Sequence, residues 1–87
     1  MKQLERVLKA LANKRRLEII KYVKKTKEAT VGSIAEKIGI SFKATSKHLG
    51  ILSGADIMEK EQRSLQMWYK LSPNAHTIVK YISNSLE

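Results

Sequence analysis

Short polar and cationic side chains recur at helical spacing after Ser41, a residue type that often caps a helix. On such a helix, Lys43, Ser46, Lys47 and Gly50 share the outward face. The inward face would carry the apolar and smaller residues, namely Ala44, Thr45, His48, Leu49 and Leu52. A lysine can reach guanine acceptors or phosphates, and a serine can hydrogen-bond a base edge or a phosphate. We therefore expect Lys43, Ser46 and Lys47 to contact duplex DNA; a solvated helix face is the plainer alternative.

A hairpin is predicted to follow this helix, with its turn around Gln62-Arg63-Ser64. An arginine at a hairpin tip can enter a minor groove or bind a phosphate. We expect Lys60, Gln62 and Arg63 to contact DNA, although the neighbouring glutamates weaken the local positive field. An ordinary solvated turn is the alternative interpretation of Arg63.

Two further pairs of residues extend the expected contact surface. Ser41 and Phe42 stand at the amino end of the outward-facing helix, where Phe42 either covers a thymine methyl group or packs under the hairpin. Lys14 and Arg15 stand at the amino end of an earlier helix, from which they can touch phosphates.

Three other polar or aromatic residues are expected to be structural. Arg16 is predicted to tie the second helix to its neighbours. His48 is predicted to be packed and hydrogen-bonded, because no second metal-type ligand lies within helical reach of it. Trp68 has a large ring, which we expect to pack against a neighbouring helix or a partner subunit.

The elements that would position these residues follow from the apolar pattern. The first two helices have helical apolar stripes, made of Leu4, Val7, Leu8 and Leu11, and then of Leu17, Ile20 and Val23. Asn13 can cap the second helix, and Ile19 and Tyr22 would lie at the edges of its buried face. Thr30 can cap a third helix that ends at Gly39, and the fourth runs from Phe42 to about Ser53.

The remaining residues predict a hairpin and one more helix. Alternation turns one set of residues inward, consisting of Leu65, Met67, Tyr69 and Leu71. Ser72-Pro73 is a capping residue followed by a proline suited to the first helical position, so we expect the last helix to begin there. Its stripe would be Ile78, Val79, Ile82 and Leu86. The predicted fold is thus mainly α with a small β-hairpin, in one domain spanning residues 1–87.

Composition restricts the possible functions. Seventeen Lys and Arg against eight Asp and Glu give a formal charge of +9, which suits a polyanionic partner. The chain has no cysteine, which excludes disulfides and thiolate chemistry and fits a reducing cytoplasm. No apolar run approaches the ~18 residues of a membrane span, so no membrane contact is expected. Phosphate-binding loops and paired catalytic acids are also missing, so we expect neither an enzyme nor a cofactor.

Four segments make the chain resemble the arsenical-resistance-repressor (ArsR-type) family of winged helix-turn-helix regulators. They are ALANKRRLEII (10–20), IAEKIGIS (34–41), TSKHLGIL (45–52) and WYKLS (68–72). The resemblance covers nearly the full length. It implies a homodimeric repressor with four helices, two strands and a last helix, in which the terminal helices form the dimer interface.

The chain departs from the family pattern at two turns and at the metal site. Asp56 and Ser64 stand where the family usually has glycine, so both turns must be made by residues that tolerate positive φ less well than glycine does. Metal-sensing members of the family carry a cysteine-containing stretch on the third helix or paired Asp and His ligands on the last helix. Here the third helix, TVGSIAEKIG, has no cysteine, and the last helix has only His76. No metal site is therefore expected.

Apolar stripes on the terminal helices favour self-association, because a chain this small cannot bury them all alone. The expected interface comprises Leu4, Val7, Leu8, Leu11, Ile78, Ile82 and Leu86. The sequence thus predicts a cytoplasmic, homodimeric, sequence-specific DNA-binding repressor that recognises an inverted-repeat operator. The alternative is a winged-helix module that binds protein or RNA and has no operator.

Overall fold

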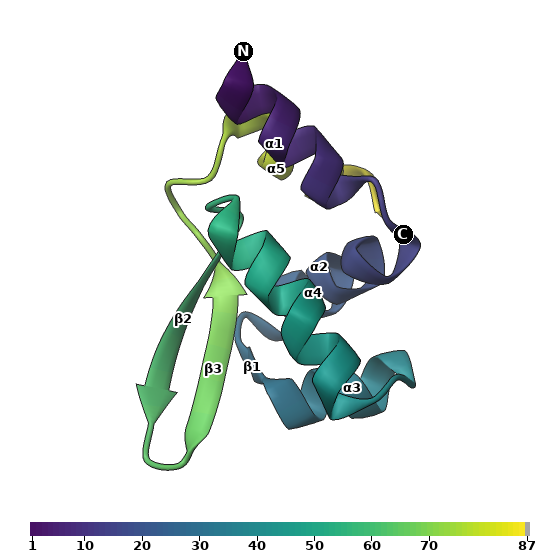
Figure 1. The fold of residues 1–87 in the computed structure, drawn as a ribbon, viewed down its shortest axis with the longest axis vertical. Helices are drawn as coiled ribbons and strands as arrows, with labels where there is room; N and C mark the ends of the chain where they lie inside the picture. The colour runs from purple at the N-terminus through teal and green to yellow at the C-terminus, as the bar shows by residue number, and fades with distance from the viewer. Residues whose placement is uncertain (87) are drawn as a thin grey trace.

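A computed structural model describes residues 1–86 as a mainly helical fold with one small antiparallel sheet (Figure 1). The elements in chain order are α1 (Lys2–Leu11), α2 (Lys14–Thr26), β1 (Ala29–Thr30), α3 (Val31–Ile38), α4 (Phe42–Gly54), β2 (Met58–Arg63), β3 (Gln66–Leu71) and α5 (Thr77–Ser85). Helices α3 and α4 form the helix-turn-helix, and β2 and β3 form a long hairpin beside it, the wing (residues 58–71). This confirms the predicted fold class.

Side-chain caps begin three of the helices where the sequence predicts them. The Asn13 side chain accepts a hydrogen bond from the Arg16 amide, and Thr30 and Ser41 accept from the amides three residues ahead. Gly39 ends α3 with φ of 80°, in the left-handed conformation. These local signals set the turn between α3 and α4.

Helix α2 lies at the centre of the fold, because it packs against helices on several sides and against β3. Ile19, Ile20 and Val23 are all completely buried. The expectation that Ile19 lies at the edge is therefore wrong, since α2 is enclosed more widely than one amphipathic stripe implies. On α4, Thr45, Leu49 and Leu52 are also completely buried, so one face of α4 is fixed to the core.

The sheet has three strands in the order β1-β3-β2, so a hairpin of two strands was an incomplete prediction. Strand β1 has only two residues, which pair as Ala29 with Tyr69 and Thr30 with Trp68. Such a short strand has no alternating pattern to detect.

Leu65 does not join the inward set of the wing, contrary to the alternation pattern. It is 98% exposed, because the chain turns at Ser64 and Leu65 and β3 begins only at Gln66. Ser64 and Asp56 have φ of 57° and 60°, which confirms that both non-glycine turns use the left-handed region.

Helix α5 begins at Thr77, so the prediction that Ser72-Pro73 opens it is wrong. The Ser72 side chain accepts from the Asn74 amide at 3.2 Å, which makes a turn, and the Ser72 amide donates to the Ile57 carbonyl at 2.9 Å. The cap of α5 is instead His76, whose Nδ1 accepts from the Ile78 amide at 3.1 Å. The Ala75 amide also donates to the Ser72 carbonyl at 3.2 Å, so Ser72 opens a single turn that ends before α5 begins.

Arg16 joins three helices at one point, as its predicted structural role requires. Its Nε donates to the Ala10 carbonyl at 2.5 Å and its Nη2 to the Lys9 carbonyl at 3.4 Å, both at the end of α1. Its Nη1 lies 3.2 Å from Nδ1 of His48, in the middle of α4. His48 is partly buried and is held by this contact, which agrees with the prediction that it is packed and hydrogen-bonded.

Burial and the charge of Arg16, with smaller effects of Lys47 and Arg15, lower the pKa of His48 below its usual value of 6.5. A neutral imidazole can accept the Arg16 hydrogen bond through Nδ1, whereas an imidazolium cannot. The native state therefore holds this proton less tightly than the unfolded state.

The turn glycine and a helix glycine give opposite predictions for the same substitution. A Cβ at Gly39 or at Gly50 meets no atom within 4 Å, so only backbone preference differs between the sites. Gly39→Ala should lower the free energy of unfolding by roughly 1–2 kcal/mol, because of its left-handed φ. Gly50→Ala should raise it by roughly 0.5–1 kcal/mol, because Gly50 is inside α4. Urea denaturation of both variants measures this; an unchanged or raised free energy of unfolding in Gly39→Ala would contradict the role given to Gly39.

His48 should make stability depend on pH. Because its native pKa is lowered, its stabilising contribution is present above pH 6.5 and is lost as the pH falls through the native pKa. Denaturation at about pH 7.5 and about pH 5.5 should show a larger loss for the parent than for His48→Gln, which does not titrate. Equal losses in the two proteins would argue against this account of His48.

Candidate nucleic-acid interface

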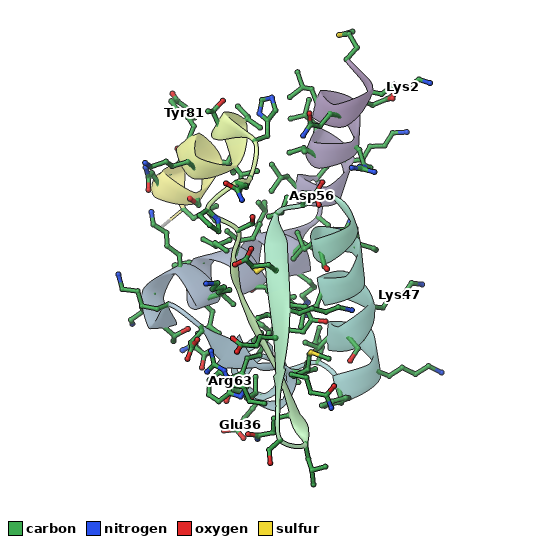
Figure 2. The ribbon with its side chains drawn as sticks, turned by 90° about the vertical axis from the view of Figure 1, so that its left-hand side faces the viewer. Lys2, Glu36, Lys47, Asp56, Arg63 and Tyr81 are labelled. Atoms are coloured by element: carbon green, nitrogen blue, oxygen red, sulfur yellow. The ribbon has the colours of Figure 1, made fainter. Side chains whose placement is uncertain are left out.

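Helix α4 presents its cationic face to solvent, because the opposite face is held in the core. Lys43, Lys47 and Gly50 are exposed and Ser46 is partly exposed, as the helical spacing predicts. In Figure 2, Lys47 extends away from the body of the molecule. Within residues 1–86, neither Lys43 nor Lys47 forms an ion pair, and α4 carries no acidic residue. These two lysines therefore have no carboxylate within 4.0 Å, among residues 1–86, that competes with a phosphate or a base.

The amino end of α4 carries an exposed aromatic ring. Phe42 is 61% exposed, so the alternative that it packs under the hairpin is wrong. Ser41 is also exposed, and its hydroxyl is used in capping α4 through the Ala44 amide at 3.0 Å. Ile51 is 39% exposed and lies one turn beyond Lys47 on the same face. It was not among the predicted contact residues, although its helical spacing from Lys47 indicates this position.

The amino end of α2 lies beside the middle of α4, because the contact between Arg16 and His48 joins them. Lys14 and Arg15 are exposed there, and Arg15 and Lys47 both lie close enough to His48 to lower its pKa. Arg15 also forms an ion pair with Glu18 at 3.0 Å, whereas Lys14 forms none within the described residues. The structure thus brings together cations that are about thirty positions apart in sequence.

The predicted wing residues divide between the two faces of the hairpin. Lys60 and Gln62 are exposed and pair across the ladder with Tyr69 and Met67, on the face of the sheet that also bears the core residues. Arg63 alternates with them and lies on the outer face. In Figure 2, Arg63 lies on the side of the hairpin away from α4, while Lys47 extends from the opposite side of the molecule.

Arg63 is held by carboxylates on this outer face. Its two terminal nitrogens donate to Glu28 at 2.8 and 2.9 Å, and Nη2 also donates to Glu61 at 3.0 Å. Its guanidinium carbon lies 4.9 Å from the ring centroid of Trp68. The hydrogen bonds from Arg63 lower the pKa of Glu28, and those same bonds raise the pKa of Arg63, so both groups remain charged. Sequence reasoning missed Glu28, which is 35 residues away and matches no motif.

The terminal helices lie at the end of the molecule opposite the tip of the wing (Figures 1 and 2). An apolar hollow of about 380 Å³ on α1 is lined by Met1, Leu4, Glu5, Leu8, Lys9 and Ala12. Leu8 is 47% exposed, and Tyr81 on α5 is 71% exposed. Val7 and Leu11 are instead buried in the chain's own core, and Ile78, Ile82 and Leu86 are partly buried against it. The apolar surface left open is narrower than the stripes predict.

Residues 1–86 contain no group of three or more His, Asp or Glu side chains placed to hold a metal ion. In the same part of the chain, no helix is both long and apolar enough to cross a membrane.

Comparison with known proteins agrees with this geometry. The family model described as "Bacterial regulatory protein, arsR family" matches residues 13–60. A search of curated proteins finds no match. The structure is similar to that of reduced HlyU from Vibrio cholerae, with a TM-score of 0.83 and 30% identity, covering 97% of this chain and 84% of that one.

Two other solved structures are also similar. One is a homodimeric winged helix-turn-helix DNA-binding domain from Mycobacterium bovis, described as a possible ArsR-family regulator; its TM-score is 0.82 at 28% identity, covering 97% of this chain and 74% of that one. The other is the transcriptional repressor BigR from Xylella fastidiosa, with a TM-score of 0.81 at 26% identity, covering 98% of this chain and 83% of that one. The family match spans more than half of the sequence, and the fold is a winged helix-turn-helix, so this chain belongs to the ArsR family of bacterial transcriptional regulators.

Proposed function

We propose that this chain binds a specific DNA duplex as a homodimer and represses transcription by occupying an inverted-repeat operator. The observation that carries the proposal is the outward face of α4, where Lys43 and Lys47 are exposed and form no ion pair within residues 1–86. An exposed helix of this kind fits the major groove, where lysine can bind guanine acceptors or phosphates. The cytoplasm is where such a regulator would act.

The distribution of charge supports an anionic partner at this face. Glu36 is the one acidic residue in residues 1–86 that forms no ion pair; the others neutralise cations on α1, α2 and the wing. Within residues 1–86, the excess positive charge is therefore carried by Arg16 and by lysines that form no ion pair, including those of α4. Phosphate contacts by such groups release counterions, which makes binding sensitive to salt.

The contact surface we propose extends from α4 to both of its neighbours. Ser41, Phe42 and Ser46 would meet base edges or backbone beside the lysines, and Gly50 would let the later turn of α4 approach the backbone closely. Lys14 and Arg15 would bind phosphates on one side of α4, and Lys60 and Gln62 would do so from the wing.

The proposed homodimer would form through the terminal helices. The apolar hollow on α1 and the exposed Leu8 and Tyr81 make a patch that a partner subunit can cover. The similar domain from Mycobacterium bovis is described as homodimeric, and BigR as a repressor. A twofold axis at this end would carry two α4 helices to successive major grooves, which matches an inverted repeat.

A module that binds protein or RNA is the competing function. A protein partner would leave the outward lysines of α4 without phosphates to bind, and the deep, narrow major groove of an RNA duplex does not admit a helix such as α4, whereas the major groove of DNA does. Duplex DNA is therefore the partner that accounts for more of the observed surface.

Replacing the outward lysines should weaken binding to a selected operator. Lys43→Ala or Lys47→Ala should cost roughly 1–3 kcal/mol if the lysine contacts a base, and should lower the salt slope by about one if it contacts a phosphate. Fluorescence anisotropy titrations at several salt concentrations distinguish these cases. Lys25→Ala, on the exposed end of α2, is the control with the same loss of charge. If both α4 variants bind like this control, α4 is not the contact surface.

A charge in the apolar patch of α1 should separate the subunits. Leu8→Asp should give monomers and abolish tight operator binding, because burying the carboxylate in an interface is costly. Leu65→Asp makes the same chemical change at the exposed wing tip and should leave the dimer intact. Light scattering at micromolar concentration measures both. A parent that is monomeric yet binds its operator tightly would refute the dimer.

A further inference from the structure

We propose that Arg63 does not bind DNA directly but is a positioning residue, which holds the wing at a fixed angle by clamping it to the connection between α2 and β1. The inference rests on the proposed function and deepens it, since it changes the role that the sequence pattern gives to the one arginine of the wing. The clamp consists of Arg63, Glu28, Glu61 and Trp68.

The Arg63 side chain runs away from the tip of the wing. Arg63 is opposite Gln66 at the end of the ladder nearest the tip, whereas Trp68 lies two residues further along β3. The guanidinium nevertheless lies over the Trp68 ring and reaches Glu28, which immediately precedes β1. The side chain thus runs back along the outer face toward the helical body, away from the tip that approaches DNA.

The partners of Arg63 in the clamp occupy its guanidinium on several sides. Glu28 accepts both arms of the guanidinium, which is the bidentate arrangement that planar recognition of a carboxylate favours. Glu61 accepts a third hydrogen bond, and the Trp68 ring lies under the cation. To bind a phosphate, Arg63 would have to leave all of these partners at once.

The clamp joins the end of β2 to the connection between α2 and β1. Strand β1 pairs only with Tyr69 and Trp68, so the outer part of the wing has no third strand beside it. The ion pair between Glu59 and Lys70 lies within the hairpin and cannot fix its angle. The pair between Arg63 and Glu28 instead joins the end of β2 to the helical body. It restrains the part of the wing that carries Gln62 and the tip.

The direction in which Glu28→Gln changes the affinity for DNA distinguishes a phosphate ligand from a positioning residue. Glu28→Gln keeps Arg63 and removes one negative charge, so it should strengthen DNA binding if Arg63 is a phosphate ligand restrained by Glu28. If Arg63 acts through Glu28, the same variant should weaken specific binding by roughly threefold to fivefold. Glu59→Gln makes the same change of charge on the same face without touching the clamp, and is the matched control.

The experiment compares Glu28→Gln, Arg63→Gln, their double variant and Glu59→Gln, using a selected operator over a series of salt concentrations. We expect both single clamp variants to bind less tightly than the Glu59→Gln control, with a salt slope changed by much less than one. The double variant should bind no more weakly than the weaker single variant, because both changes open the same clamp. Trp68 is the only tryptophan, so its fluorescence should change in both clamp variants without DNA and report the opening directly.

Three outcomes would overturn the positioning role. These are binding by Glu28→Gln as tight as that of Glu59→Gln, a salt slope lowered by about one in Arg63→Gln, or unchanged Trp68 fluorescence in both clamp variants. If the proposed function is wrong, the parent protein itself selects no duplex. If only the positioning role is wrong, the parent protein still binds its selected operator.

Discussion

The hydrogen bonds of one side chain, Arg16, fix the position of α1 relative to α4. They join the carbonyls of Ala10 and Lys9 at the end of α1 to His48 in the middle of α4. Helix α1 carries the apolar patch and α4 the outward lysines, so the angle between the proposed dimer surface and the proposed DNA surface depends on this junction. Two recognition helices can match two half-sites only if that angle is constant in both subunits.

The core and the ion pairs together leave one face of α4 available. Thr45, Leu49 and Leu52 fix its inward side, and the buried Thr45 hydroxyl donates to the Ser41 carbonyl at 2.8 Å, so no polar group is left unpaired there. Within residues 1–86, every acidic residue except Glu36 pairs with a cation away from α4, most clearly at the clamp on the outer face of the wing. Among the same residues, the lysines of α4 therefore form no ion pair, whereas the arginine of the wing is used to hold the wing in position.

The sequence predicts best what depends on neighbouring residues. The caps at Asn13, Thr30 and Ser41 and the left-handed Gly39 are local signals, and the outward face of α4 follows from helical spacing. The family resemblance is confirmed as well. Prediction fails where contacts between residues that are far apart in the sequence determine the local structure. Glu28 meets Arg63 only in the folded chain, β1 is recognisable only beside β3, and the capping signal at Ser72 yields one turn, after which α5 begins at Thr77.

Selection of duplexes from a random library, followed by hydroxyl-radical footprinting of the enriched sequence, tests the central claim most directly. The account predicts enrichment of an inverted repeat whose half-sites are about 10 base pairs apart or a multiple of that spacing, protected on one face of the duplex by two subunits. Enrichment of no common sequence, or protection of a single half-site by one subunit, would contradict it.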